Sequence, residues 1–340
     1  MSKLPRFKRF LLSCCTLVLL CGCGQSDEVK VRISGATMGT TYHITYIANP
    51  TSPSQTYLQT KIDNALDQVN QVASTYIVSS ELSQLNQSQS TAPQQYSAAL
   101  TEMLAEGIHL AQFTQGYLDI TVGPLVNLWG FGPDHHPKFI PSAAMIAQAK
   151  QDVGAHFLAL DGQSVRKLNP KVYVDLSTLA KGYGVDVVAD TLAAEGIDNY
   201  LVEIGGEMRI AGHSLAQQDW RIAVEKPVAE QRQVQHVLQP KDSAVATAGD
   251  YRNFFDENNV RYSHIIDPNT GYPIHHHTVS VTVVGKSCMA ADGLSTGLMV
   301  MGVEKGLALA EANNIAAMFI TRNDDGSFSE HYSQAFQQYL

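Results

Sequence analysis

The stretch TVSVTVVGKSCMAADGLSTGLMVMG, residues 278–302, holds both kinds of element that decide this fold. Its opening residues, 278–285, alternate between apolar and polar side chains in the way that predicts a β-strand. Helical sequence follows across 288–312, and the apolar run IAAMFI, residues 315–320, predicts a late strand. Strand and helical segments therefore succeed one another at this end of the chain.

The rest of residues 31–340 shows the same mixture. Residues 31–48 predict a β-hairpin around a Gly-rich turn, and the Gly-, Pro- and aromatic-rich residues 116–133 predict a structured loop. Helices are expected over 56–73, over 97–114, after Ser142 and over 178–195. Short strands are expected at 156–160, 164–168, 171–176, 199–204, 219–227, 233–238, 243–249 and 260–267. Because runs of strands mix with helices, the sequence favours one large α+β domain over a doubly wound sheet.

The first residues of the chain are typical of a targeting segment. Residues 1–10 carry four basic side chains and no acidic one. The apolar run LLSCCTLVLL, residues 11–20, follows them and is too short to span a membrane comfortably. Residues 1–22 are therefore expected to be a cleaved signal peptide.

A lipid anchor is expected directly after this segment. Leu20, Cys21 and Gly22 precede Cys23 in a pattern that resembles a bacterial lipobox, which implies that Cys23 receives the lipid. An ordinary cysteine-rich signal peptide is the alternative. The small residue before Cys23 and the polar tether over 23–30 favour the lipobox. The anchor predicts a periplasm-facing membrane lipoprotein, with the inner membrane expected and the outer membrane left open.

Charge and cysteine content exclude several classes of protein. The chain is 44% hydrophobic and 16% charged, which is compatible with a folded core. Removal of residues 1–22 moves the formal net charge from −9 to −13, because four basic residues leave. An acidic body is a poor partner for nucleic acid. Cys288 is the only cysteine after Cys23, so an internal disulfide of the body and a multi-cysteine zinc site are both excluded.

The stretch DLSTLAKGYGVD, residues 175–186, is a candidate anion site. Asp175 follows an apolar run, Ser177 or Thr178 can cap the next helix, and Lys181 lies one turn into it. A helix start offers free N–H groups to an anion, although a simple helix cap is the more frequent reason for such residues. No Gly-x-Gly-x-x-Gly follows an expected strand and no Walker A motif occurs, so a nucleotide would be held by other means.

The helix over 288–312 contains a candidate Mg²⁺ site. Asp292 and Thr296 are four residues apart and therefore share one helix face. One carboxylate and one hydroxyl, completed by water or substrate oxygens, suit the oxygen preference of Mg²⁺. A polar pair facing solvent is the alternative.

The stretch SHIIDPNTGYPIHHH, residues 263–277, raises the question of a zinc site. Adjacent side chains in an extended segment point to opposite faces, so the three consecutive histidines from His275 to His277 do not suit one metal. The DPNTGYP segment between is typical of a turn. His264, at the end of the preceding strand, is instead a candidate general base, with a structural histidine as the equal alternative.

Taken together, these stretches resemble the ApbE-type FAD:protein FMN transferases over nearly all of residues 31–340. The motifs that carry the resemblance, in chain order, are GATMGTTY (35–42), STYIVSSELSQLN (74–86), GYLDITVGPLVNLWGFG (116–132), DLSTLAKGYGVD (175–186), YLVEIGGEMRIAG (200–212), ATAGDYRNFF (246–255), YSHIIDPNTGYPI (262–274) and ADGLSTGLMVMG (291–302). The resemblance implies a single T-fold-like catalytic domain over 31–340.

The resemblance also implies roles for individual residues. Thr178, Asp292 and Thr296 match the family's Mg²⁺-binding positions, and His264 matches a histidine thought to assist the incoming hydroxyl. Positions that match contacts to FAD are Met38, Tyr76, Tyr117, Leu118, Asp119, Asp175, Lys181 and Ile266.

The activity implied is Mg²⁺-dependent transfer of FMN from FAD to a Thr or Ser hydroxyl of a partner protein, with release of AMP. The expected partner is an exported redox subunit of the Rnf or Nqr type. Two alternatives remain open: an FAD pyrophosphatase that gives FMN to water, and a lipid-anchored FAD-binding protein without catalysis.

Overall fold

The computed structural model describes residues 28–132, 139–228, 233–250, 254–257 and 260–340. The signal peptide expected over 1–22, the lipidation expected at Cys23 and most of the tether expected over 23–30 lie outside these residues. Within the described ranges, every helix is too short or too polar to cross a membrane.

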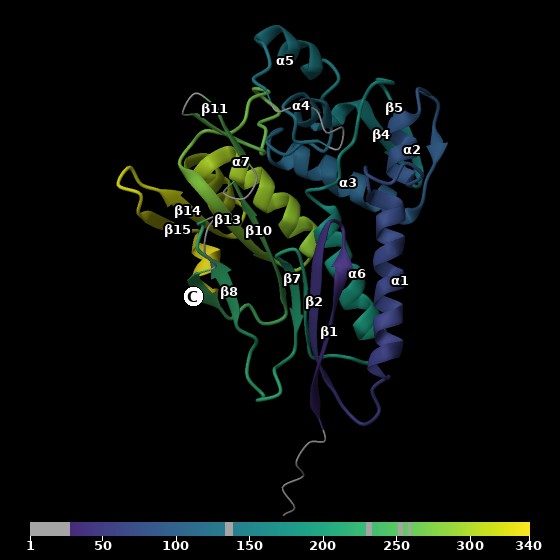
Figure 1. Ribbon diagram of the computed structural model, residues 1–340, viewed down its shortest axis with the longest axis vertical. Helices are drawn as coiled ribbons and strands as arrows, with labels where there is room; N and C mark the ends of the chain where they lie inside the picture. Colours follow the sequence, from purple (N-terminus) through teal and green to yellow (C-terminus); the bar gives the residue numbers. More distant parts are fainter. Residues whose placement is uncertain (1–27, 133–138, 229–232, 251–253, 258–259) are drawn as a thin grey trace, which may run out of the picture.

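An antiparallel sheet forms the centre of the fold (Figure 1). In the part of the chain that the structure describes it has eight strands in the order β1-β2-β6-β7-β10-β13-β14-β15. They are β1 (Val29–Thr37), β2 (Thr40–Ala48), β6 (Tyr200–Ile204), β7 (Glu207–Ala211), β10 (Ser243–Gly249), β13 (Thr278–Gly285), β14 (Ala316–Arg322) and β15 (Phe328–Tyr332). Each neighbouring pair is antiparallel, so the expected α+β class is confirmed.

Three helices cover one face of this sheet: α1 (Gln55–Ala73), α6 (Ala180–Ala194) and α7 (Cys288–Ala312). Helix α1 forms because Leu58, Ile62, Leu66 and Val69 return to one side every three or four residues, and all four are buried. The Ser54 hydroxyl accepts a hydrogen bond from the backbone N–H of Tyr57 and so begins this helix.

The opposite face of the sheet is also covered. The hairpin of β8 (Ile222–Glu225) and β9 (Val234–Leu238) packs there together with the 3₁₀ segment η2 (Gln334–Tyr339). Strand β13 is therefore buried on both faces, which explains why its side chains are inaccessible almost throughout.

A second layer of short elements lies at one end of the sheet, at the top and upper right in Figure 1. Its helical members are α2 (Glu81–Gln87), α3 (Ala98–Phe113), α4 (Gly123–Leu128), α5 (Ala143–Lys150) and η1 (Ala155–Phe157). Its strands are β3 (Gln94–Gln95), β4 (Leu158–Asp161) and β5 (Ser164–Lys167), with the hairpin of β11 (Phe254–Glu257) and β12 (Val260–Ser263) nearby.

The hairpin over 31–48 and the helices expected over 56–73, over 97–114 and after Ser142 are confirmed. The prediction that residues 116–133 contain no regular element is wrong, because Pro124 occupies the first turn of α4, where its missing N–H costs nothing. The strand expected at 171–176 is also wrong. Its apolar residues alternate into the core, but the segment pairs with a loop through the Asp175 N–H and the Ile120 carbonyl at 2.7 Å. Alternation alone does not supply a partner strand.

Candidate active site

Helices α6 and α7 approach each other closely at Gly182. A Cβ atom at this position would lie 2.4 Å from the Cys288 carbonyl oxygen and 2.7 Å from the Met289 Cα. Only glycine leaves room for the backbone of α7 at that separation. The close approach places the Gly182 backbone N–H 3.0 Å from Oδ2 of Asp292, so a free N–H at the start of α6 holds a carboxylate of α7.

We predict that Gly182→Ala lowers the free energy of unfolding by about 3 kcal/mol or more, because the contact is with rigid backbone rather than with a flexible side chain. The midpoint of thermal unfolding, followed by circular dichroism, measures this loss. Gly285→Ala is the matched control, since its new Cβ would have no atom nearer than 3.9 Å. Equal melting temperatures for the two variants would contradict the tight crossing.

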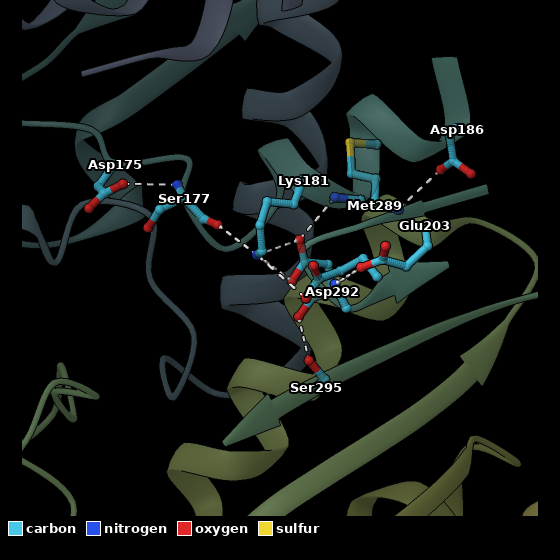
Figure 2. Close-up of polar contacts among 11 residues, drawn as sticks. Asp175, Ser177, Lys181, Asp186, Glu203, Met289, Asp292 and Ser295 are labelled. Atoms are coloured by element: carbon cyan, nitrogen blue, oxygen red, sulfur yellow. Dashed lines mark hydrogen bonds and ion pairs between the residues drawn. The ribbon is translucent and has the colours of Figure 1, made fainter. Parts of the chain in front are cut away.

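Asp186, the last residue of the DLSTLAKGYGVD stretch, fixes the start of α7 (Figure 2). Its carboxylate accepts hydrogen bonds from the Ser287 hydroxyl at 2.9 Å and from the N–H groups of Cys288 and Met289 at 3.1 and 3.0 Å. Arg209 of β7 donates to the same carboxylate at 3.1 Å. A negative charge at a helix start is favourable, so this contact fixes the first turn of α7 relative to α6.

A buried charge cluster lies at the crossing. The Lys181 ammonium is 3.4 Å from Oδ2 of Asp292 and 3.5 Å from Oε1 of Glu207, the first residue of β7. The two carboxylate side chains are each only 5% exposed, whereas that of Lys181 is 28% exposed. Figure 2 shows the ammonium between the Ser177 carbonyl and the Asp292 carboxylate.

One ammonium does not neutralise two buried carboxylates. Burial raises the pKa of Glu207 to about 8, with Lys181 acting in the opposite direction. Burial also raises the pKa of Asp292, again against Lys181 and the Gly182 N–H. Burial lowers the pKa of Lys181, but Asp292 and Glu207 outweigh it and the net shift is upward. Asp292 has two donors, whereas Oε2 of Glu207 is buried without a hydrogen-bond partner.

The oxygen atoms at this crossing suit Mg²⁺. Oγ1 of Thr178 is buried without a hydrogen-bond partner just before α6, and Thr296 stands four residues after Asp292 on α7. No group of three His, Cys, Asp or Glu side chains in the described residues could hold a metal by itself. A site with one carboxylate and a few neutral oxygens is nevertheless what Mg²⁺ uses when substrate phosphates complete its shell.

Two of the residues expected to contact FAD lie against these helices. Met38 forms the β1–β2 turn with a φ of 49°, which is unusual for a residue other than glycine, and its Sδ-methyl group packs over Gly184 of α6. Leu118 is buried against α7, where a Cβ at Gly297 would lie 3.3 Å from the Leu118 Cβ. Both side chains therefore border the crossing.

Other candidates for FAD contacts have structural partners. Oδ1 of Asp119 accepts hydrogen bonds from the N–H and hydroxyl of Thr121, and Oδ2 accepts one from the Ala155 N–H. The Tyr117 hydroxyl accepts a hydrogen bond from Lys305 at 2.6 Å. Asp175 accepts one from the Ser177 N–H at 2.9 Å and so shapes the turn before α6.

His264 and Ile266 belong to a second group of residues. His264 directly follows β12, is half-buried, and its ring centroid lies 6.4 Å from that of Phe131. Ile266 is 4% exposed and packs with Trp129. Residues 117–131 connect this group to the crossing, since Leu118 touches α7 and Phe131 touches His264.

Tyr76 is largely exposed to solvent. It stands in the connection between α1 and α2, and it is 71% exposed. Its N–H donates to the Ser74 hydroxyl at 3.1 Å.

Sequence reasoning assigned no role to Gly182, Asp186 or Glu207. Glu207 follows Gly205 and Gly206 at the start of a short strand, within the stretch YLVEIGGEMRIAG, residues 200–212. An acidic side chain at an inward strand position is unusual, and that signal could have indicated a buried charge.

The two buried carboxylates and the ammonium come from three chain segments, and such a cluster marks a candidate functional site on this α+β fold. A model of the ApbE family matches residues 38–319, and the chain belongs to that family.

Similar proteins agree with this assignment. The chain is 50% identical over 333 residues to the FAD:protein FMN transferase of Vibrio cholerae serotype O1, covering 98% of this chain and 99% of that protein. It is 44% identical to the Haemophilus influenzae FAD:protein FMN transferase, over 92% of both chains. The solved flavin transferase ApbE from Vibrio cholerae has a TM-score of 0.86 at 51% identity, covering 92% of this chain and all of that one. The apo form of the Pseudomonas stutzeri flavinyl transferase ApbE gives 0.85 at 38% identity, over 92% of this chain and 96% of that one.

Proposed function

We propose that this chain is an FAD:protein FMN transferase. The observation that carries the proposal is the 50% identity to the Vibrio cholerae enzyme across 98% of this chain, which includes every segment of the site. The buried, partly neutralised carboxylates at the α6–α7 crossing give this activity a physical centre.

The reaction is a substitution at one phosphorus of the FAD pyrophosphate. The acceptor hydroxyl oxygen forms a bond to the phosphorus on the flavin side, and the bond from that phosphorus to the bridging oxygen breaks. AMP leaves with the bridging oxygen and its electron pair. His264 takes the proton of the attacking hydroxyl, a role suited to an imidazole near neutral pH.

The residues divide this work between them. Asp292, Thr296 and an oxygen of Thr178 would hold Mg²⁺. When bound, Mg²⁺ screens the pyrophosphate and the charge that develops on the leaving group. Lys181 places a fixed positive charge at the same crossing, and Leu118 and Met38 supply apolar surface for a ring of FAD.

The cellular setting follows from the N-terminal sequence. Cleavage before Cys23 and lipidation of that residue would hold the enzyme on the periplasmic face of a membrane. The acceptor would then be an exported redox subunit of the Rnf or Nqr type, reached at the inner membrane.

Incubation with FAD, Mg²⁺ and a candidate acceptor tests the proposal. Intact mass spectrometry should show one added FMN on the acceptor, with an equal amount of AMP in solution. FMN released to water without any adduct on the acceptor would identify a pyrophosphatase instead. Absence of AMP would leave only a flavin-binding protein.

A further inference from the structure

Lys181 presents a conflict within the proposed metal site. Its ammonium stands 3.4 Å from Oδ2 and 3.5 Å from Oδ1 of Asp292, the carboxylate expected to bind Mg²⁺. Two cations at one carboxylate repel each other, and burial weakens the screening between them. A divalent cation at Asp292 therefore requires the ammonium to have another partner of opposite charge.

Glu207 is placed to be that partner. Glu207 lies on β7, the strand next to β6, and its side chain is 5% exposed. Its Oε1 is 3.5 Å from the Lys181 ammonium. Its Oε2 is buried and has no hydrogen-bond partner. Within the residues that the structure describes, the remaining acceptor of the ammonium is the Ser177 carbonyl at 3.5 Å, which is neutral.

We propose that Glu207 is a positioning residue, which holds the Lys181 ammonium whenever a divalent cation occupies Asp292. This inference rests on the proposed function, because it assumes a cation at that carboxylate. A small shift of the flexible lysine side chain toward Glu207 exchanges one buried ion pair for another. The ammonium then stays at the crossing, beside the position expected for the FAD phosphates, instead of competing with the cation.

Glu207→Gln tests this proposal in the mature enzyme. The amide keeps the volume of the side chain but cannot neutralise the ammonium, so Lys181 stays on Asp292. We expect the dissociation constant for Mg²⁺ to rise about 10–100-fold, as for other residues that orient metal ligands. It is measured as the Mg²⁺ concentration that half-saturates the rise in melting temperature, without FAD and again at saturating FAD.

Glu203→Gln is the matched control. It removes the same charge from the same β6–β7 hairpin, but its carboxylate binds His43 at 2.8 Å and the Gly206 N–H at 2.6 Å. Its Mg²⁺ affinity should stay within about twofold of wild type. An equal loss in both variants would show that any nearby negative charge suffices, and would overturn a specific role for Glu207.

A double-mutant cycle with Lys181→Met separates positioning from direct action. If Glu207 acts through Lys181, adding Glu207→Gln to Lys181→Met changes Mg²⁺ affinity no further. A full additional loss would mean that Glu207 acts on the cation itself and would overturn the inference. If Lys181→Met does not fold, Glu207→Asp replaces it, because the shorter side chain keeps the charge but cannot reach the ammonium. Wild-type affinity in Glu207→Asp would also overturn the inference.

The outcome is separable from that of the proposed function. Wild-type FMN transfer together with normal Mg²⁺ affinity in Glu207→Gln rejects the inference alone. A wild-type melting temperature that does not respond to Mg²⁺ rejects the cation at Asp292 and this inference together. The transferase assignment itself would be rejected only if the wild-type protein added no FMN to any acceptor.

Discussion

Replacement of Asp292 by alanine should reduce FMN transfer by about 10³-fold or more, which corresponds to ~4 kcal/mol of lost transition-state stabilisation. Asp292 supplies the only carboxylate on α7 at the crossing within the described residues, and the Gly182 N–H and Lys181 both point at it. The variant should still fold, because Lys181 keeps Glu207 as its counter-charge. FAD affinity should change much less, since most FAD contacts are expected elsewhere.

Steady-state transfer to an acceptor and equilibrium titration of FAD fluorescence measure these two quantities. Asp190→Ala is a suitable control, because Asp190 also belongs to an ion pair at α6 but its side chain is 70% exposed. Turnover that survives in Asp292→Ala with unchanged Mg²⁺ dependence would show that the metal assignment is wrong.

Replacement of His264 by alanine should slow transfer by about 10²–10⁴-fold while leaving the affinity for FAD close to wild type. A threonine hydroxyl is a poor nucleophile at neutral pH, so the loss of the base should appear in kcat rather than in KM.

His275→Ala serves as the comparison, since this exposed imidazole lies in the same loop region, eleven residues later in the chain. A wild-type rate for His264→Ala, or an equal loss in both variants, would remove the role of general base. A fall in melting temperature with unchanged rate per folded molecule would identify His264 as a structural residue packed on Phe131.

Several features of this protein could be read from local sequence because their causes are local. The four apolar residues of α1 report burial at fixed spacing, and both α1 and β13 lie where the spacing predicts. Asp292 could be singled out in the same way, as a carboxylate four residues before Thr296 on one helix face. The order of the motifs then sufficed to indicate the ApbE family.

The partners of these residues depend on contacts between distant segments. Glu207, Lys181 and Asp292 come from β7, α6 and α7, and no periodicity within one segment reports that their charges meet. The strand expected at 171–176 failed for a related reason, since its alternation buries side chains but a loop takes the place of a partner strand. Hydrophobic spacing is a property of a single segment, so the sequence alone determined the class of fold, most elements and the family. The close packing of Gly182 against α7, and the sharing of one ammonium by two buried carboxylates, were decided only when tertiary packing removed water from between those segments.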